Sequence, residues 1–71
     1  MEEYTNSQAR EIIAEVLHSE RDRRLMERRL IDGIVIEKLA EEFELSVSQV
    51  KRIIIRDSDI IFRQIEKMNR K

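Results

Sequence analysis

The side chains best suited to chemistry gather in one short stretch, residues 46–56. They are Ser48, Gln49, Lys51, Arg52 and Arg56. Lysine and arginine bind phosphate, while glutamine suits the edge of adenine and arginine or lysine that of guanine. The stretch holds three basic residues and no acidic one, although the whole chain has a net charge of −1. These residue types at this density predict contact with a polyanion.

Catalysis has no support in the sequence. A single glycine excludes a glycine-rich phosphate loop, and the absence of cysteine excludes disulfides and thiolate metal sites. His18 is the only histidine and has no neighbouring cysteine, which favours a structural role over a metal ligand. Glu41 and Glu42 belong to an expected solvated helix face, without a pocket that would raise a pKa. We expect no enzyme activity, no catalytic residue, no cofactor, no metal and no small-molecule substrate.

Two short helices joined by a tight turn must position the basic stretch. Apolar residues recur every three or four positions on both sides of residues 44–46, which is typical of helices with one buried face. Ser46 and Gln49 form a capping box, so the second helix should begin at Val47. The expected helices cover 35–43 and 47–56. The inward-facing residues of the second are expected to be Val47, Val50 and Ile54, with Ile53 partly inward.

The stretch 31–53 carries a characteristic set of patterns. They are Asp32-Gly33, Leu39-Ala40-Glu41-Glu42-Phe43 and Ser46-Val47-Ser48-Gln49-Val50-Lys51-Arg52. In these patterns the chain resembles the helix-turn-helix of region four of bacterial sigma factors and of small regulators related to it. The resemblance begins near Glu20 and ends near Arg56. It departs at Val35, where the family usually has a Ser or Thr cap, and at Glu44, where it has glycine and where we expect a positive φ.

The resemblance implies a sequence-specific regulator of transcription that binds double-stranded DNA. Family contacts to bases and phosphates fall at positions that match Val47, Ser48, Lys51 and Arg52, although the best-known members have a basic residue at Val47. The expected DNA-binding residues of this chain are Ser48, Gln49, Lys51, Arg52 and Arg56. The resemblance also implies a structural role for Arg29, which ties helices together. A chain this small, without a sensor domain, resembles regulators of phages and mobile elements.

The remaining sequence predicts three more helices, which makes an all-α fold of about five short helices in a single domain, residues 1–71. Thr5 and Gln8 form a capping box for a helix that ends near Leu17. Ser19 opens a helix that should stop at Gly33, with its apolar positions at Leu25, Met26 and Leu30. The helix-turn-helix core is expected over 34–56. Asp57, Ser58 and Asp59 then predict a boundary before a last helix over 59–69.

Five arginines of the second helix have two interpretations, a phosphate-contacting surface or a solvated face. They are Arg21, Arg23, Arg24, Arg28 and Arg29. Four acidic residues are interspersed with them, and mixed signs favour the solvated face.

The apolar residues of the last helix exceed one stripe, and this predicts a homodimer. The expected interface residues are Ile55, Ile60, Phe62 and Ile65. The alternative is a monomer in which the N-terminal helix covers this surface. The apolar surplus and the net acidity also favour a rival function, a protein-interaction module that binds RNA polymerase, a sigma factor or another protein.

Membrane insertion and secretion are not expected. No apolar run approaches the roughly 20 residues of a membrane span, and the N-terminus is acidic, unlike a signal peptide. The expected compartment is the cytoplasm.

Overall fold

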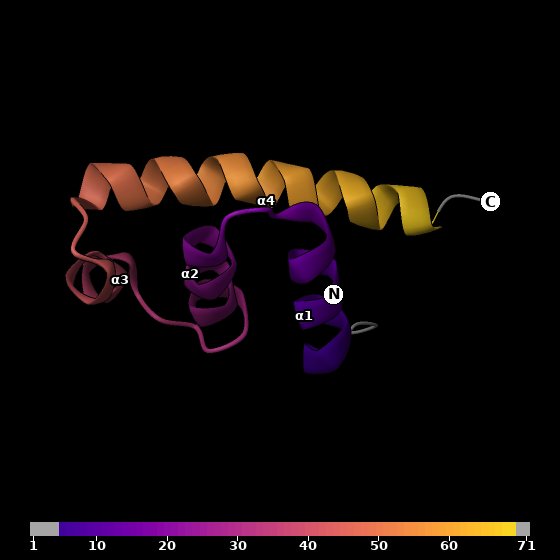
Figure 1. Cartoon of the computed structure of the whole chain (residues 1–71), viewed down its shortest axis with the longest axis horizontal. Coiled ribbons are helices and arrows are strands. Elements are labelled where there is room, and N and C mark those ends of the chain that lie inside the picture. Colours follow the sequence, from indigo (N-terminus) through magenta and orange to yellow (C-terminus); the bar gives the residue numbers. More distant parts are fainter. Residues whose placement is uncertain (1–4, 70–71) are drawn as a thin grey trace.

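The computed structural model describes residues 5–69, and this part of the chain is all α-helical, with four helices and no strand. The helices are α1 (Asn6–Val16), α2 (Glu20–Leu30), α3 (Ile36–Phe43) and α4 (Val47–Asn69). Each of the first three packs against α4, and Figure 1 shows α4 running the length of the molecule with α1, α2 and α3 below it. The longest helix therefore organises the fold.

Side-chain caps begin α1 and α2 where the sequence predicts. The Thr5 hydroxyl accepts a hydrogen bond from the Gln8 backbone N–H at 3.2 Å, and the Gln8 side chain accepts one from the Thr5 N–H at 2.9 Å. Ser19 accepts from the Asp22 N–H at 3.3 Å. Val35 precedes α3 without a side-chain cap. The bonds of Thr5 and Ser19 satisfy backbone N–H groups that the start of a helix would otherwise leave unpaired.

One apolar core joins the four helices. Its buried residues are Ile12, Ile13, Leu17, Leu25, Met26, Leu39, Ala40, Val50, Ile53 and Ile61. The N-terminal helix contributes through Ile12 and Ile13, and Leu17 directly after it is also buried. Three details of register differ from the prediction. Val47 is exposed, and Ile53 is more buried than Ile54. Leu30 of α2 is also exposed.

The prediction of a fifth helix is wrong, because the segments 47–56 and 59–69 belong to one continuous helix. Residues 57–59 contain neither proline nor glycine, so nothing in the backbone forces a break. Asp57 lies on the buried face between Val50 and Ile61, and it is only 1% exposed. Burial and ion pairing hold Asp57 inside the helix, where propensity alone favours a cap.

The end of α2 also differs in detail. The helix ends at Leu30, before the expected stop at Gly33, which adopts a φ of 71°. The Ile34 N–H then bonds back to the Arg28 carbonyl at 3.1 Å. Arg29 donates from Nη1 to the Ile34 carbonyl at 3.0 Å. Arg29 thereby ties α2 to the loop before α3, which is the structural role expected for it.

Candidate nucleic-acid interface

The turn between α3 and α4 sets the direction in which α4 leaves α3. Glu44 adopts φ 55° and ψ 47°, a left-handed conformation, so the positive φ expected at this residue is confirmed. The Leu45 N–H bonds to the Ala40 carbonyl at 2.9 Å and closes the end of α3. A non-glycine residue in this conformation costs about 1–2 kcal/mol. The turn is therefore strained at one residue and closed by backbone hydrogen bonds.

A capping box fixes the start of α4, as predicted. The Gln49 N–H donates to the Ser46 hydroxyl at 3.1 Å, and the Ser46 N–H donates to Gln49 Oε1 at 2.9 Å. The cap limits the expected role of Gln49, because a bidentate contact to adenine requires both the oxygen and the nitrogen of the amide. Because the oxygen is engaged in the cap, Gln49 retains only its NH₂ group for a ligand.

All five expected DNA-binding residues are exposed, and four of them lie on the first turns of α4. These four are Ser48, Gln49, Lys51 and Arg52. Within residues 5–69, neither the Lys51 ammonium nor the Arg52 guanidinium forms an ion pair. Both cations are therefore available to an external anion.

Arg56 differs from the other two basic residues of the stretch. Its Nη2 donates to Asp22 Oδ2 at 2.6 Å, and its Nε donates to Asp57 Oδ1 at 3.2 Å. These bonds raise the pKa of Arg56, chiefly through Asp57. The stretch is free of acids along the sequence, but in space Arg56 lies beside two carboxyl groups. One guanidinium nitrogen, Nη1, remains for other contacts.

Sequence reasoning missed the buried carboxyl pair formed by Asp22 of α2 and Asp57 of α4. Asp22 is 4% exposed, and its Oδ1 accepts from both Nε and Nη2 of Arg21 at 3.1 Å. Asp57 Oδ2 is buried and has no hydrogen-bond partner within the described part of the chain. One signal existed: Asp57 occupies an inward position of α4, seven residues after Val50 and four before Ile61.

The two carboxyl groups have opposite pKa shifts. Burial raises the pKa of Asp57, and the neighbouring Asp22 raises it further, although Arg56 opposes both. Burial also works against ionisation of Asp22, but hydrogen bonds from Asp57 and Arg21 and the charges of Arg21 and Arg56 lower its pKa overall. Two neighbouring carboxyls repel each other when both are ionised, which is why their pKa values move apart.

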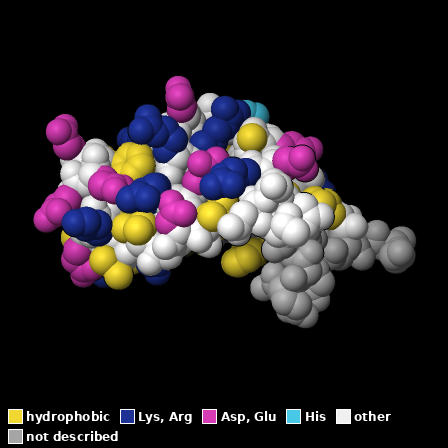
Figure 2. Space-filling view, turned by 90° about the horizontal axis from the view of Figure 1, so that it is seen from below, with side chains coloured by type: hydrophobic (Ala, Val, Ile, Leu, Met, Phe, Trp, Pro, Cys, Tyr) yellow, Lys and Arg dark blue, Asp and Glu magenta, His cyan; other side chains and the backbone are white. Residues whose placement is uncertain are grey.

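The other arginines of α2 mostly tie the helices together. Arg28 bonds to Glu42 of α3 and, at 3.1 Å, to Asp32, while Arg23 donates to the Leu17 carbonyl at 2.5 Å. Figure 2 views the molecule from the side of α1–α3 and shows basic and acidic side chains interspersed over that face. This mixture agrees with the solvated, ion-paired interpretation of these arginines.

Other kinds of site find no support among the described residues. His18 is exposed, and within residues 5–69 no group of three or more His, Asp or Glu side chains is arranged to hold a metal ion. None of the described helices is both long enough and apolar enough to cross a membrane. Comparisons with protein-family models, with curated proteins and with solved structures give no match to this chain.

Proposed function

We propose that α3, the turn and the first half of α4 form a helix-turn-helix of the sigma region-four type. In this proposal the protein binds double-stranded DNA in a sequence-specific manner and regulates transcription. The observation that carries it is the start of α4, a capped helix end on which Lys51 and Arg52 are exposed and have no acidic partner among residues 5–69. Recognition helices of this motif place their N-terminal residues against base edges in the major groove.

The arrangement of α3 and α4 supports an approach through α4. In Figure 1 the first turns of α4 lie at the end of the molecule beside α3, away from α1. The exposed side of α3 carries Glu37, Glu41 and Glu42, which repel phosphate. Arg28 neutralises Glu42 through its ion pair. Ser48, Lys51 and Arg52 therefore face the duplex in this proposal, with Gln49 as cap and Arg56 as support.

Duplex binding across a salt series tests the function. Fluorescence anisotropy would follow a labelled duplex of random sequence between about 50 and 200 mM salt, where phosphate contacts give a linear fall of log K with log salt. Lys51→Ala should weaken binding to every sequence. Arg52→Ala should cost about 1–3 kcal/mol, confined to preferred sequences if the residue reads a base and common to all if it binds phosphate.

A matched control comes from the far half of α4. Lys67→Ala removes one exposed charge outside the proposed helix-turn-helix and should leave duplex binding nearly unchanged. If Lys51→Ala and Arg52→Ala both bind as tightly as the wild type, the assignment of the reading helix is wrong. If the wild type shows no salt-dependent binding, the function as a whole is wrong.

A second function, a protein-interaction module, is favoured by one observation. Ile55 and Phe62 of α4 are 71% and 62% exposed, which is unusual for large apolar side chains. RNA polymerase or a sigma factor would be the partner in that case. Within the first function, we propose that the same residues make the protein a homodimer on DNA.

A further inference from the structure

A hollow between α2 and α4 lies beside the proposed reading helix. Its volume is about 160 Å³, and its lining residues are Arg21, Leu45, Gln49, Arg52, Ile53 and Arg56. Since a water molecule takes about 30 Å³ of the liquid, the space suffices for one tetrahedral oxyanion. Four of the six lining side chains are polar or basic, so the hollow is suited to an anion.

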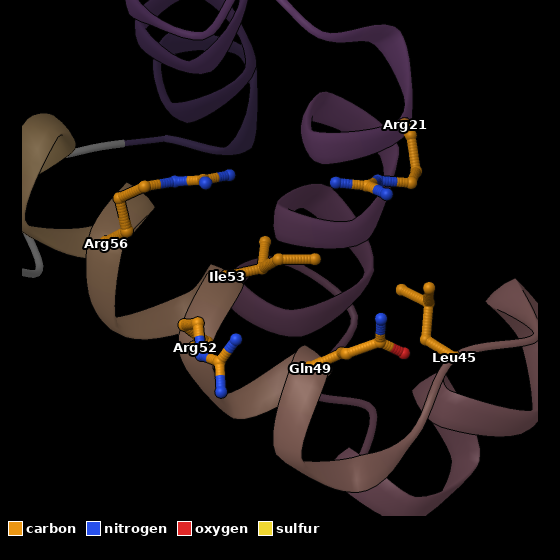
Figure 3. A pocket seen from close by; sticks show the side chains of 6 residues that line it. All are labelled: Arg21, Leu45, Gln49, Arg52, Ile53 and Arg56. Carbon is orange, nitrogen blue, oxygen red and sulfur yellow. The ribbon is translucent and has the colours of Figure 1, made fainter.

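The cations of the hollow come from two helices. Figure 3 shows Arg21 of α2 and Arg56 of α4 pointing toward each other above Ile53. Arg52 and Gln49 lie nearer the start of α4, and the Arg52 side chain points away from the other two arginines. Like charges in this arrangement repel, and Asp22 holds them in place by accepting from Arg21 on Oδ1 and from Arg56 on Oδ2. The hollow is therefore preorganised by an ion-pair network behind it.

The guanidinium groups keep donors for a ligand after these bonds are made. Arg21 and Arg56 each use Nε and Nη2, which leaves Nη1 on both. Arg52 has no ion pair among residues 5–69, and each guanidinium carries five N–H donors. Three arginines stand against two carboxyls, Asp22 and Asp57, so the local charge is positive even when both are ionised.

We infer that this hollow is an oxyanion site that takes a backbone phosphate of the bound duplex, held by Arg21, Arg52 and Arg56. The inference rests on the proposed function and deepens it in two ways. Arg52 becomes a phosphate ligand rather than a base reader, and α2 contributes Arg21 from outside the helix-turn-helix. Planar arginine forks match the geometry of phosphate oxygens, which lysine does not.

The first test is the salt dependence of duplex binding. Arg52→Gln and Arg21→Gln should each weaken binding to all sequences and reduce the slope of log K against log salt by about 0.9, the value for one lost phosphate contact. Arg63→Gln is the control, because Arg63 lies in the far half of α4 and pairs with Asp59 on the same helix. Circular dichroism would establish that each variant is folded.

The second test uses the wild type alone and does not depend on any variant. Inorganic phosphate would be titrated against sodium chloride at equal ionic strength, while nuclear magnetic resonance follows the arginine side-chain Nε–H signals. Saturable shifts at Arg21, Arg52 and Arg56, with Arg63 unmoved, support the site. The same signals should move when duplex DNA replaces phosphate.

The outcomes separate this inference from the proposed function. If the wild type binds duplex but neither glutamine variant changes the slope, the hollow is not the phosphate site, although the function stands. If phosphate moves the signals but no duplex binds, the oxyanion site stands and its assignment to DNA is wrong. If neither ligand moves them, the inference is wrong.

Discussion

Glu44 carries the strain of the turn, and its replacement tests how much that strain costs. Glycine adopts positive φ freely, so Glu44→Gly removes about 1–2 kcal/mol of strain. It adds about 0.5–1 kcal/mol of backbone entropy to the unfolded state, so the free energy of unfolding should rise by up to about 1.5 kcal/mol. Urea unfolding would measure the change. Glu41→Gly, inside α3, is the control and should lose about 1 kcal/mol. A similar loss in both variants would contradict the strained turn.

Asp57 makes stability depend on pH. A raised folded pKa means that the contribution of this group is complete below the ordinary value of 3.8 and is lost as pH rises through the folded pKa. The buried Asp57 carboxyl therefore contributes less to the free energy of unfolding at neutral pH than it does in acid. Asp57→Asn supplies a permanent N–H donor toward Asp22 and should be more stable than the wild type near neutrality, with the advantage shrinking toward acid. Urea unfolding at a series of pH values measures this.

Two further variants check the sign of that effect. Asp22 has a lowered pKa, so its contribution is present at neutral pH and is lost as pH falls through its folded pKa. Asp22→Asn should therefore destabilise the protein at neutral pH, opposite to Asp57→Asn. Asp59→Asn changes an exposed carboxyl two residues away and should do little. Equal effects of Asp57→Asn and Asp59→Asn would show that burial of Asp57 is irrelevant.

At the scale of the element, the start of α4 depends on Ser46. Its hydroxyl accepts from the Gln49 N–H, so Ser46→Ala should cost about 1 kcal/mol of stability, the usual value for a lost cap. Ser48→Ala is the control, because it removes an exposed hydroxyl two residues later that does not cap the helix. Thermal unfolding of the two variants decides the matter. Identical melting temperatures would contradict the assignment of the cap.

Helix starts were predictable from the sequence, whereas the end of α2 and the break expected at residues 57–59 were not. The bonds of Thr5, Ser19 and Ser46 are local, reaching three residues along the chain, so the sequence contains all the information needed. Asp57-Ser58-Asp59 has the composition of a helix cap, but whether the segment is helical depends on contacts with Asp22 and Arg56. Tertiary contact overrode propensity there, and five expected helices became four.

At the scale of the molecule, the charge of the candidate site could not be read along the chain. Ser48, Lys51 and Arg52 lie on one exposed helix surface, as helical spacing predicts. The pairing of Arg56 with Asp22 joins residues 34 positions apart, and it depends on how α2 packs against α4. Arg21 enters the hollow for the same reason. Sequence periodicity predicts faces of single helices, and sites shared between helices require the packing.

The packing of α1 determines which apolar residues of α4 remain exposed for a second copy of the chain. α1 packs against α4, and Ile61 is buried and Ile65 half-buried against the core, so Ile65 is less available to a partner than expected. Ile55 and Phe62 remain exposed and are seven residues apart, nearly in line along α4. Ile60 lies two residues before Phe62, about 200° around the helix, and belongs to another side. The exposed apolar line therefore consists of Ile55 and Phe62.

We predict that the protein is a homodimer whose α4 helices cross antiparallel at Ile55 and Phe62. Ser48 lies about 16 Å from the midpoint of these residues at about 1.5 Å per residue, so two-fold pairing separates the two reading ends by about 32 Å. One duplex turn is about 34 Å, which suits a palindromic site. A small core also gains stability from association.

Sedimentation equilibrium measures this association directly. The wild type should show twice the chain mass of 8.6 kDa at micromolar concentration. Phe62→Glu should give a folded monomer, because a buried unpaired charge opposes pairing. Ile60→Glu makes the same chemical change on another side of α4 and should leave the dimer intact. A wild-type mass near that of one chain would rule out the dimer, and equal dissociation in both variants would place the interface elsewhere on α4.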